Sequence, residues 1–258
     1  MLHGDGSVNF VDLSKPDVSA KHSEKDSLRN GILLALPHRE RESLLAQLEW
    51  IDLPVRTILH ENQEPIEYAY FVNAGLASVL TVMPDGKSVE VGLTGKEGFV
   101  GVLLLTGLVT SPNQVVMQVG GNAFRLKVRG FNDVLQRSPK LEQLLLRCAQ
   151  ELTTQATQTA ACNGLHEVHQ RLARWLLMSQ DRLGGDIVPL TQQFLAHMLG
   201  TRRASVTVAA GRLQRTGMIA YNRGVVRIKN RRKLEAAACA CYRMMRRQFR
   251  RWEGESKN

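Results

Sequence analysis

Short apolar segments separated by glycine and proline residues fill the first half of the chain, and longer segments with helical spacing fill the second half. The short segments are rich in valine, leucine, tyrosine and phenylalanine, which favours β-strands. Six such strands spaced by about ten residues are typical of a sandwich or barrel. Asp85-Gly86 lies between two of them and predicts a type I′ hairpin turn. The predicted strands cover residues 55–59, 68–72, 77–83, 88–93, 115–119 and 123–128.

Polar and helical segments precede these strands. Residues 1–28 are polar with little apolar periodicity, so we expect a disordered or loosely ordered extension. Apolar and charged residues then alternate at helical spacing, and Pro37 marks the start of a helix. We therefore expect a β-domain over residues 29–138 that begins with a helix.

A long helix is predicted over residues 139–165, which begin with a proline. Seven positions in it are separated by alternating steps of four and three residues, which is the heptad pattern of a coiled coil. We expect this stripe to pair with the same helix of a second subunit. The alternative is one amphipathic helix packed on its own domain. The candidate dimer-interface residues are Leu141, Leu145, Cys148, Leu152, Gln155, Thr159 and Cys162.

Residues 166–233 carry the pattern of a winged helix-turn-helix. Thr191 is a good N-cap for a short helix. Gly200-Thr201 predicts a tight turn before a second helix that begins near Arg202. Two short strands around Asn222-Arg223-Gly224 add a β-hairpin wing. The second helix has an apolar stripe of Val206, Ala209, Ala210 and Leu213.

The positive charge of the chain is concentrated near its C-terminus. The whole chain has a net charge of +10, and residues 185–258 alone hold 16 basic and 4 acidic residues. Such a field attracts DNA, because each neutralised phosphate releases condensed counterions. A solubilising basic tail is the alternative. We expect double-stranded DNA as partner, with these candidate contacts: Thr191, Gln192, Thr201, Arg202, Arg203, Ser205, Thr207, Arg212 and Arg223.

Several motifs in these segments are shared with a known family: Tyr70-Phe71-Val72, Gly75, Asp85-Gly86, Gly98-Phe99-Val100-Gly101, Leu190-Thr191-Gln192-Gln193, Leu199-Gly200-Thr201-Arg202-Arg203 and Ser205-Val206. With these motifs and its order of β-domain, long helix and winged helix-turn-helix, the chain resembles the Crp/Fnr superfamily of bacterial transcription regulators. The resemblance implies an α+β fold with an N-terminal antiparallel β-roll of the cyclic-nucleotide-binding jelly-roll type, a long dimerisation helix and a C-terminal winged helix-turn-helix. It also implies a homodimer that binds a two-fold-symmetric DNA site and recruits or blocks RNA polymerase.

The residues that bind cyclic AMP in this superfamily are replaced in this chain. The resemblance places the glutamate that caps the ribose hydroxyl at Val102, and the Arg-Ser pair that holds the cyclic phosphate at Pro112-Asn113. These side chains cannot make those contacts, and residues 99–117 contain no arginine. An unneutralised cyclic phosphate would cost several kcal/mol, so we expect that cyclic AMP does not bind.

The DNA-reading helix also departs from the superfamily. Arg203 matches its guanine-reading arginine, but Ala204 replaces an acidic neighbour and Val208 replaces a second arginine. Because arginine reads guanine O6 and N7 bidentately, we expect Arg203 to set one base position in a half-site that differs from the best-known consensus.

We expect no metal ion, haem or iron–sulfur cluster. Iron–sulfur members of the superfamily use several N-terminal cysteines, and this chain has none before Cys148. Cys239 and Cys241 are two residues apart in a predicted helix, so they would point to different faces and form no metal pair. Three histidines are candidate haem ligands, namely His60, His166 and His169. Each is a lone histidine, which is weak evidence for a haem site.

The mode of regulation is open in the sequence. Cys148 and Cys162 pack as small hydrophobes or, alternatively, form a redox switch between two subunits. Gating by another small ligand or by haem is a further alternative. Residues 234–258 predict a basic helix and tail that extends the phosphate footprint or is only a solvated face. Its arginines are Arg243, Arg246, Arg247, Arg250 and Arg251.

The sequence argues against several function classes. It has no phosphate-binding loop, metal triad or nucleophile motif, so we expect no enzyme activity and no catalytic residue. The longest apolar run, residues 99–109, is shorter than the ~20 residues of a membrane span. With no signal-peptide pattern, we expect a cytoplasmic protein without a membrane partner. An architectural DNA binder without sequence preference is the alternative to a specific regulator.

Overall fold

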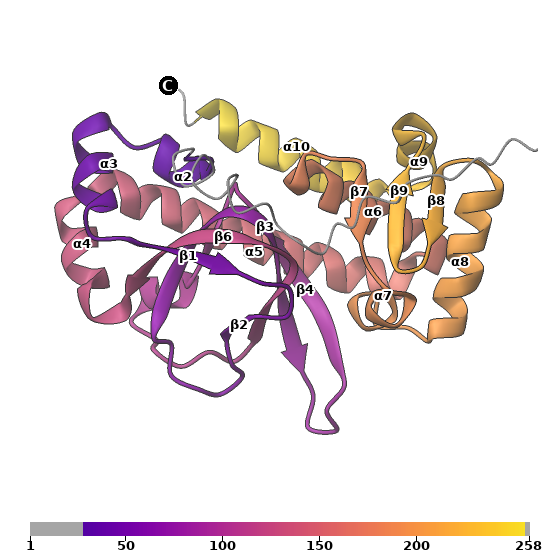
Figure 1. Cartoon of the computed structure of the whole chain (residues 1–258), viewed down its shortest axis with the longest axis horizontal. Coiled ribbons are helices and arrows are strands. Elements are labelled where there is room, and N and C mark those ends of the chain that lie inside the picture. The colour runs from indigo at the N-terminus through magenta and orange to yellow at the C-terminus, as the bar shows by residue number, and fades with distance from the viewer. Residues whose placement is uncertain (1–27, 256–258) are drawn as a thin grey trace, which may run out of the picture.

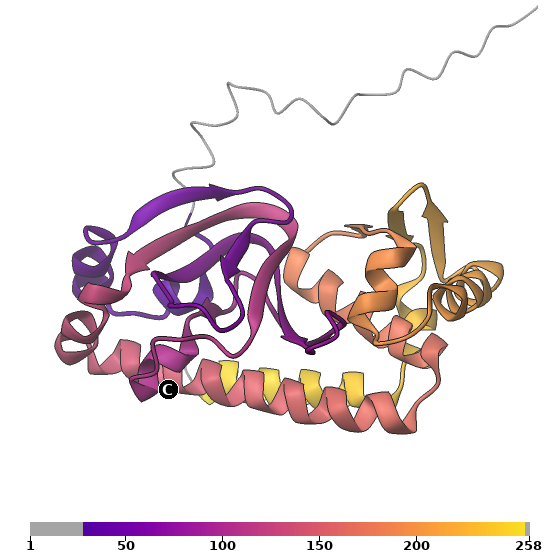
Figure 2. The same cartoon turned by 90° about the horizontal axis from the view of Figure 1, so that it is seen from below.

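The computed structural model describes residues 28–255, apart from the side chains of Gln193 and of residues 249–255. The extension predicted for residues 1–28 lies outside the described residues except for Leu28. A sheet domain and a helical domain lie end to end, and one long helix runs beneath both of them (Figures 1 and 2).

Antiparallel strands build the sheet domain. The strands are β1 (Glu49–Leu53), β2 (Ile58–His60), β3 (Tyr68–Val82), β4 (Ser88–Thr94), β5 (Phe99–Val100) and β6 (Gln114–Lys127). They pair in the order β1-β6-β3-β4, while β2 also pairs with β6 and β5 with β3. The helices are α2 (Gly31–Leu34), α3 (His38–Leu45), η1 (Val102–Thr106), η2 (Val128–Gly130) and α4 (Phe131–Arg137). The helix predicted at Pro37 is α3.

Two pairs of predicted strands are single long strands. Strand β3 joins the segments predicted at 68–72 and 77–83, and β6 joins the last two predicted strands. Glycines bend these strands instead of ending them. Gly75 has φ 92°, and a Cβ atom on Gly121 would lie 2.0 Å from the Ala74 carbonyl oxygen. The register shifts on both sides of Ala74, which curves the sheet into a roll.

The hairpin between β3 and β4 is not the predicted type I′ turn. In the loop Pro84-Asp85-Gly86 only the glycine has a positive φ, 78°. The Met83 backbone N–H donates to the Lys87 carbonyl across the loop at 2.8 Å. Because proline fixes φ near −65°, Pro84 begins a three-residue loop that closes through the left-handed glycine.

Helix α5 (Pro139–Leu165) has the predicted length, but its heptad stripe faces its own chain. Its first half packs into the sheet-domain core. Farther along, the Gln155 side chain bonds the Leu93 backbone N–H and carbonyl at 3.1 and 3.3 Å. Leu152 is half-buried. The assignment of this stripe to a subunit interface is therefore wrong for the residues that the chain itself buries: Leu141, Leu145, Cys148, Gln155, Thr159 and Cys162.

The helical domain contains the predicted winged helix-turn-helix. Its elements are α6 (Val168–Leu183), β7 (Ile187–Pro189), α7 (Gln192–Met198), α8 (Arg203–Arg215), β8 (Ile219–Asn222) and β9 (Val225–Ile228). The three strands form a small sheet in the order β7-β9-β8. The type I′ geometry appears here, at the wing tip, where Arg223 has φ 43° and Gly224 has φ 81°.

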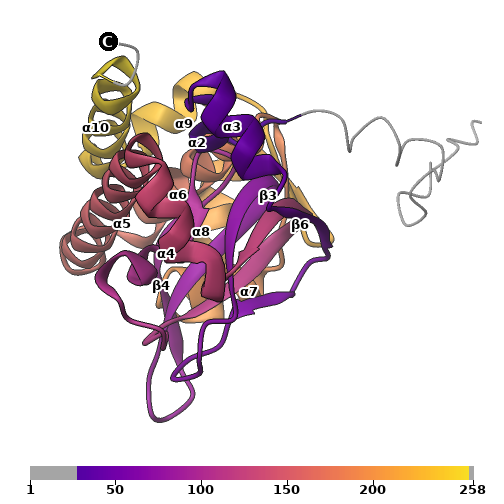
Figure 3. The same cartoon turned by 90° about the vertical axis from the view of Figure 1, so that its left-hand side faces the viewer.

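The single C-terminal helix predicted by the sequence is two helices, α9 (Arg231–Ala237) and α10 (Ala240–Glu255). The chain is extended at Ala238, and Cys239, Cys241 and Tyr242 are buried around the break. No glycine or proline marks it, so the packing of these side chains overrides local helix propensity. Helix α10 then lies alongside α5 (Figure 3). Within residues 28–255, no helix has both the length and the apolar character needed to cross a bilayer.

The two domains share one apolar core. Leu76 and Leu93 of the sheet pack with Trp175 and Leu176 of α6. The Trp175 indole N–H donates to the carboxylate of Glu90, on β4, at 2.8 Å. The sheet domain and the DNA-binding pattern are therefore in direct contact through α6.

Candidate nucleic-acid interface

A tight turn joins α7 to α8 and sets their directions. The Thr191 side chain caps α7 by accepting a hydrogen bond from the Phe194 backbone N–H. Gly200 turns the chain with φ 54°, a conformation that favours glycine. The apolar stripe of α8 is buried as predicted, and α8 packs against α6 and α7. The opposite side of α8 is thereby left to solvent.

The N-terminal end of α8 presents an exposed basic surface. Arg202 is its N-cap and Arg203 its first residue, and both side chains are exposed. Among residues 28–255, neither forms a salt bridge. The helix N-terminus adds partial positive charge and free backbone N–H groups. This end of α8 can therefore bind phosphate or donate to guanine O6 and N7.

Polar side chains connect the start of α7 to the exposed side of α8. The exposed Thr207 hydroxyl donates to Gln192 Oε1 at 2.8 Å. Thr201 and Ser205 are half-buried, one in the turn and one on the first turns of α8. Gln192, Arg203 and Thr207 thus belong to one continuous polar surface.

Arg212 lies on a different side of α8. Its Nη1 atom is 3.3 Å from His169 Nδ1 and 3.8 Å from Glu167 Oε2, both at the start of α6. A hollow between α6 and α8 is lined by residues of both helices, among them Ala204, Val208 and Arg212 itself. The position of Arg212 favours a phosphate contact over a base contact.

The wing lies next to the start of α7. The Leu190 backbone N–H donates to the Gly224 carbonyl at 2.6 Å, and the Tyr221 hydroxyl donates to the Leu190 carbonyl at 3.2 Å. Arg223 is exposed at the tip. The wing arginine and Thr191 therefore flank the same end of the helix pair.

A cavity of about 210 Å³ lies inside the sheet domain and against α5. The described residues that line it include Val102 and Asn113 but no lysine, arginine, aspartate or glutamate. The only titratable side chain in it is that of His60, whose Nε2 lies 2.8 Å from the Tyr68 carbonyl. Burial lowers the pKa of His60, so the imidazole is neutral at neutral pH. The cavity offers no cation to a phosphate.

The predicted redox pair lies in two separate cores. Cys148 is in the sheet-domain core, where burial raises the pKa of its thiol to about 12. Cys162 is in the core shared by the domains, with its Sγ atom 3.4 Å from that of Cys239. The sequence did not predict the contact between Cys162 and Cys239, because its pattern places Cys239 and Cys241 on one unbroken helix.

The candidate haem ligands lie at separate places. His60 is in the sheet-domain cavity and His166 lies beside Cys241. His169 is 3.0 Å from the Glu167 carboxylate. Each of the three histidines thus has a different polar neighbour among the described residues.

Two protein families match the chain, one in each domain. Residues 53–138 match the family described as a cyclic nucleotide-binding domain. Residues 170–237 match the Crp-like helix-turn-helix domain. No curated protein matches the chain in sequence.

Solved structures share the whole arrangement at low sequence identity. The c-di-GMP responsive global regulator CLP of Xanthomonas campestris is 19% identical, with a TM-score of 0.63 over 74% of this chain and 99% of that one. FixK2 of Bradyrhizobium japonicum is 16% identical, with a TM-score of 0.63 over 75% and 98%. A putative transcriptional regulator of the Crp/Fnr family from Eubacterium rectale is 13% identical, with a TM-score of 0.63 over 80% and 96%. The fold predicted from the sequence is confirmed by these likenesses.

Proposed function

The chain belongs to the Crp/Fnr superfamily of DNA-binding transcription regulators, and from this premise we propose that it binds a specific, two-fold-symmetric operator as a homodimer. The observation that carries the proposal is the exposed, unpaired basic end of α8 beside the wing. The surrounding net positive charge supports it. We propose regulation of transcription, through contact with RNA polymerase, and no enzyme activity.

Each group on this surface has a separate role in the proposed complex. Arg203 donates to guanine O6 and N7 in the major groove. Arg202 and Thr191 bind phosphate oxygens at the helix N-termini. Arg223 binds the backbone where the wing meets the neighbouring groove. Gln192 and Thr207, which already share a hydrogen bond, read adjacent base edges.

The proposed dimer uses the exposed face of α5, since the heptad stripe is buried in the chain. This face includes Leu146, which is 53% exposed, together with Thr153 and Ala160. Small residues allow close approach of a second α5. A two-fold axis along this face would bring two α8 helices to successive turns of one duplex.

The experiment is selection of binding sites from random duplexes by the purified protein without added ligand. We expect a palindromic consensus bound by two chains. Arg203→Ala is then expected to cost about 1–3 kcal/mol on the selected site and to relax one base position in each half-site. Arg223→Ala should weaken specific and random DNA alike and lower the salt slope by about 1.

A matched control is Arg137→Ala, because Arg137 is exposed at the end of α4, in the other domain. It should leave both affinities unchanged. Selection that yields no consensus, together with a steep salt dependence, would instead support an architectural DNA binder. Equal losses on specific and random DNA for Arg203→Ala would contradict its base-reading role.

A member gated by a small ligand is the second candidate, and the cavity against α5 favours it. Its walls are mainly apolar, with Thr94 and Ser111 among the few polar side chains. Because a neutral, mostly apolar molecule fits such a lining better than a nucleotide, we propose that class for any effector. Screening neutral ligands for a rise in melting temperature tests this candidate.

A further inference from the structure

Four side chains that can bind a metal ion converge where α5 ends and α10 begins. Cys162 lies in the last turn of α5, His166 follows that helix directly as its C-cap, and Cys239 and Cys241 flank the start of α10. Their three Sγ atoms and one imidazole nitrogen all lie within 4.8 Å of one another. The Sγ atoms of Cys162 and Cys239 are 3.4 Å apart, and Cys241 Sγ is 3.5 Å from His166 Nδ1.

These separations have the size of one tetrahedral ion. A zinc–sulfur bond of about 2.3 Å places two sulfur ligands of a tetrahedron about 3.8 Å apart. We propose that Cys162, His166, Cys239 and Cys241 form a Cys₃His site for one zinc ion. Binding requires that the three thiols lose their protons to solvent and that His166 is neutral.

Buried positive charge around the cluster supports an anionic site. Arg174 is 3% exposed and Arg171 is also buried, and within the described residues neither forms a salt bridge with a carboxylate. The Glu90 carboxyl group interacts with Arg174 electrostatically, but burial favours its protonated form, so it neutralises these guanidinium groups only in part. A buried guanidinium without a full counter-charge is costly. Three thiolates around one zinc ion carry a net charge of −1. A zinc-bound site would therefore provide a counter-charge to these two guanidinium groups.

Polar and charged groups around the thiols suit thiolate ligands. Cys162 Sγ lies within hydrogen-bond distance of Cys239 Sγ, and the positive charge of the nearby Arg174 favours the Cys162 thiolate. The Gln158 amide Nε2 lies 3.1 Å from Cys241 Sγ. Donors of this kind stabilise thiolate ligands from outside the coordination sphere.

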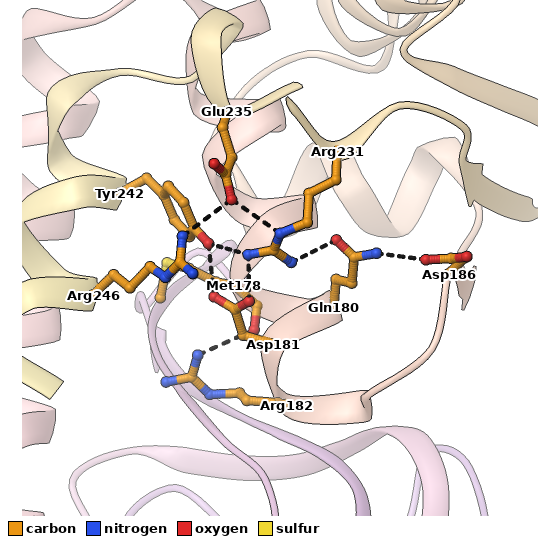
Figure 4. A network of polar contacts seen from close by, with 9 residues as sticks. All are labelled: Met178, Gln180, Asp181, Arg182, Asp186, Arg231, Glu235, Tyr242 and Arg246. Carbon is orange, nitrogen blue, oxygen red and sulfur yellow. Dashed lines mark hydrogen bonds and ion pairs between the residues drawn. The ribbon is translucent and has the colours of Figure 1, made fainter. Parts of the chain in front are cut away.

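A polar network holds the ligand-bearing segments in place (Figure 4). Arg231 of α9 donates to Gln180 and Asp181 of α6, each at 2.7 Å. The Tyr242 hydroxyl of α10 donates to the same Asp181 carboxylate at 2.9 Å. Cys239 and Cys241 are therefore presented to α5 by a fixed backbone, and zinc would fasten α10 to the helix beneath both domains.

Two other uses of the cluster fit less well. A disulfide between Cys162 and Cys239 would leave Cys241 and His166 without a role. An iron–sulfur cluster sets its ligands farther apart, because several irons lie between them. All four ligand atoms here lie close enough to share a single ion.

The test uses the full-length protein, reduced and treated with a chelator, then titrated with Zn²⁺ and separately with Co²⁺. We expect one equivalent of zinc per chain by atomic emission. Cobalt should give thiolate charge-transfer bands and the intense visible bands of a tetrahedral site. Cys239→Ser and Cys241→Ser should each lower the affinity for zinc at least tenfold. Cys148→Ala is the matched control, because Cys148 is buried in the other core, and it should bind as the wild type does.

The zinc titration of the wild-type protein can refute the proposal on its own. The test therefore does not depend on whether the serine variants fold. Less than stoichiometric zinc uptake by the reduced wild type would refute it. Preferential assembly of iron and sulfide, or zinc binding that survives both serine substitutions, would refute it as well. None of these readouts involves DNA, so this proposal and the proposed function fail separately.

Discussion

At the residue scale, Glu90 is a buried acid whose protonation depends on folding. It is buried between β4 and α6 and accepts hydrogen bonds from Ser78 and Gln118 at 2.7 Å and from Trp175 at 2.8 Å. Burial outweighs these bonds and raises the pKa of Glu90 to about 7. A protonated Glu90 can donate to Gln118 Oε1, which has no hydrogen-bond partner among the described residues, once the amide rotates.

This shift predicts a specific pH dependence of stability. Because the folded chain holds the Glu90 proton more tightly than the unfolded chain does, its contribution is complete below pH 4.5 and is lost as the pH rises through 7. The loss is about 3 kcal/mol. Glu90→Gln should remove it, as measured by urea unfolding at a series of pH values. Glu64→Gln, at an exposed position, should keep the wild-type profile. Parallel profiles for wild type and Glu90→Gln would contradict the assignment.

The sequence could predict residue types on the proposed DNA-binding surface but not the environment of Glu90. The polar positions of α7, α8 and the wing follow from local rules, because Thr191 is a cap and Gly200 a turn residue. The strand that contains Glu90 was predicted as well. Which face of this strand packs against Trp175 depends on how the two domains dock. The residues next to Glu90 in the sequence do not determine this.

At the element scale, periodicity predicted helices correctly but not their partners. The heptad pattern of α5 gives its length and the direction of its apolar stripe. The same pattern fits a second subunit or the chain's own core, and the burial of Leu145 and Gln155 decides for the core. The break at Cys239 has no local signal at all. Only the i, i+4 spacing of Cys162 and His166 hinted at a shared site.

Adjacent leucines on α5 test this conclusion. Leu145 is fully buried and Leu146 is 53% exposed. Leu145→Ala should lower the free energy of unfolding by about 2–5 kcal/mol because it leaves a cavity in the sheet-domain core. Leu146→Ala should change the stability of a single chain by less than about 0.5 kcal/mol. Chemical unfolding at low protein concentration measures both, and equal losses would mean that the two faces of α5 are wrongly assigned.

At the scale of the whole molecule, helix α5 contacts both domains. Its middle borders the sheet-domain cavity through Leu152 and Ala156. Its end packs on α10, and α6 follows it directly. A ligand in the cavity could alter DNA binding by moving α5, provided that the ligand binds one arrangement better than the other.

Cyclic AMP should not be such a ligand. Among residues 28–255, none that lines the cavity carries a cation, and Val102 is one of the lining residues. Since the phosphate charge would be buried without a partner, we expect no heat of binding in calorimetry and an unchanged operator affinity when cyclic AMP is added. A regulator that carries the phosphate-binding arginine serves as positive control. Micromolar affinity for cyclic AMP would contradict this expectation. It would mean that a rearrangement brings a cation into the cavity, and the second subunit would be the first place to look for that cation.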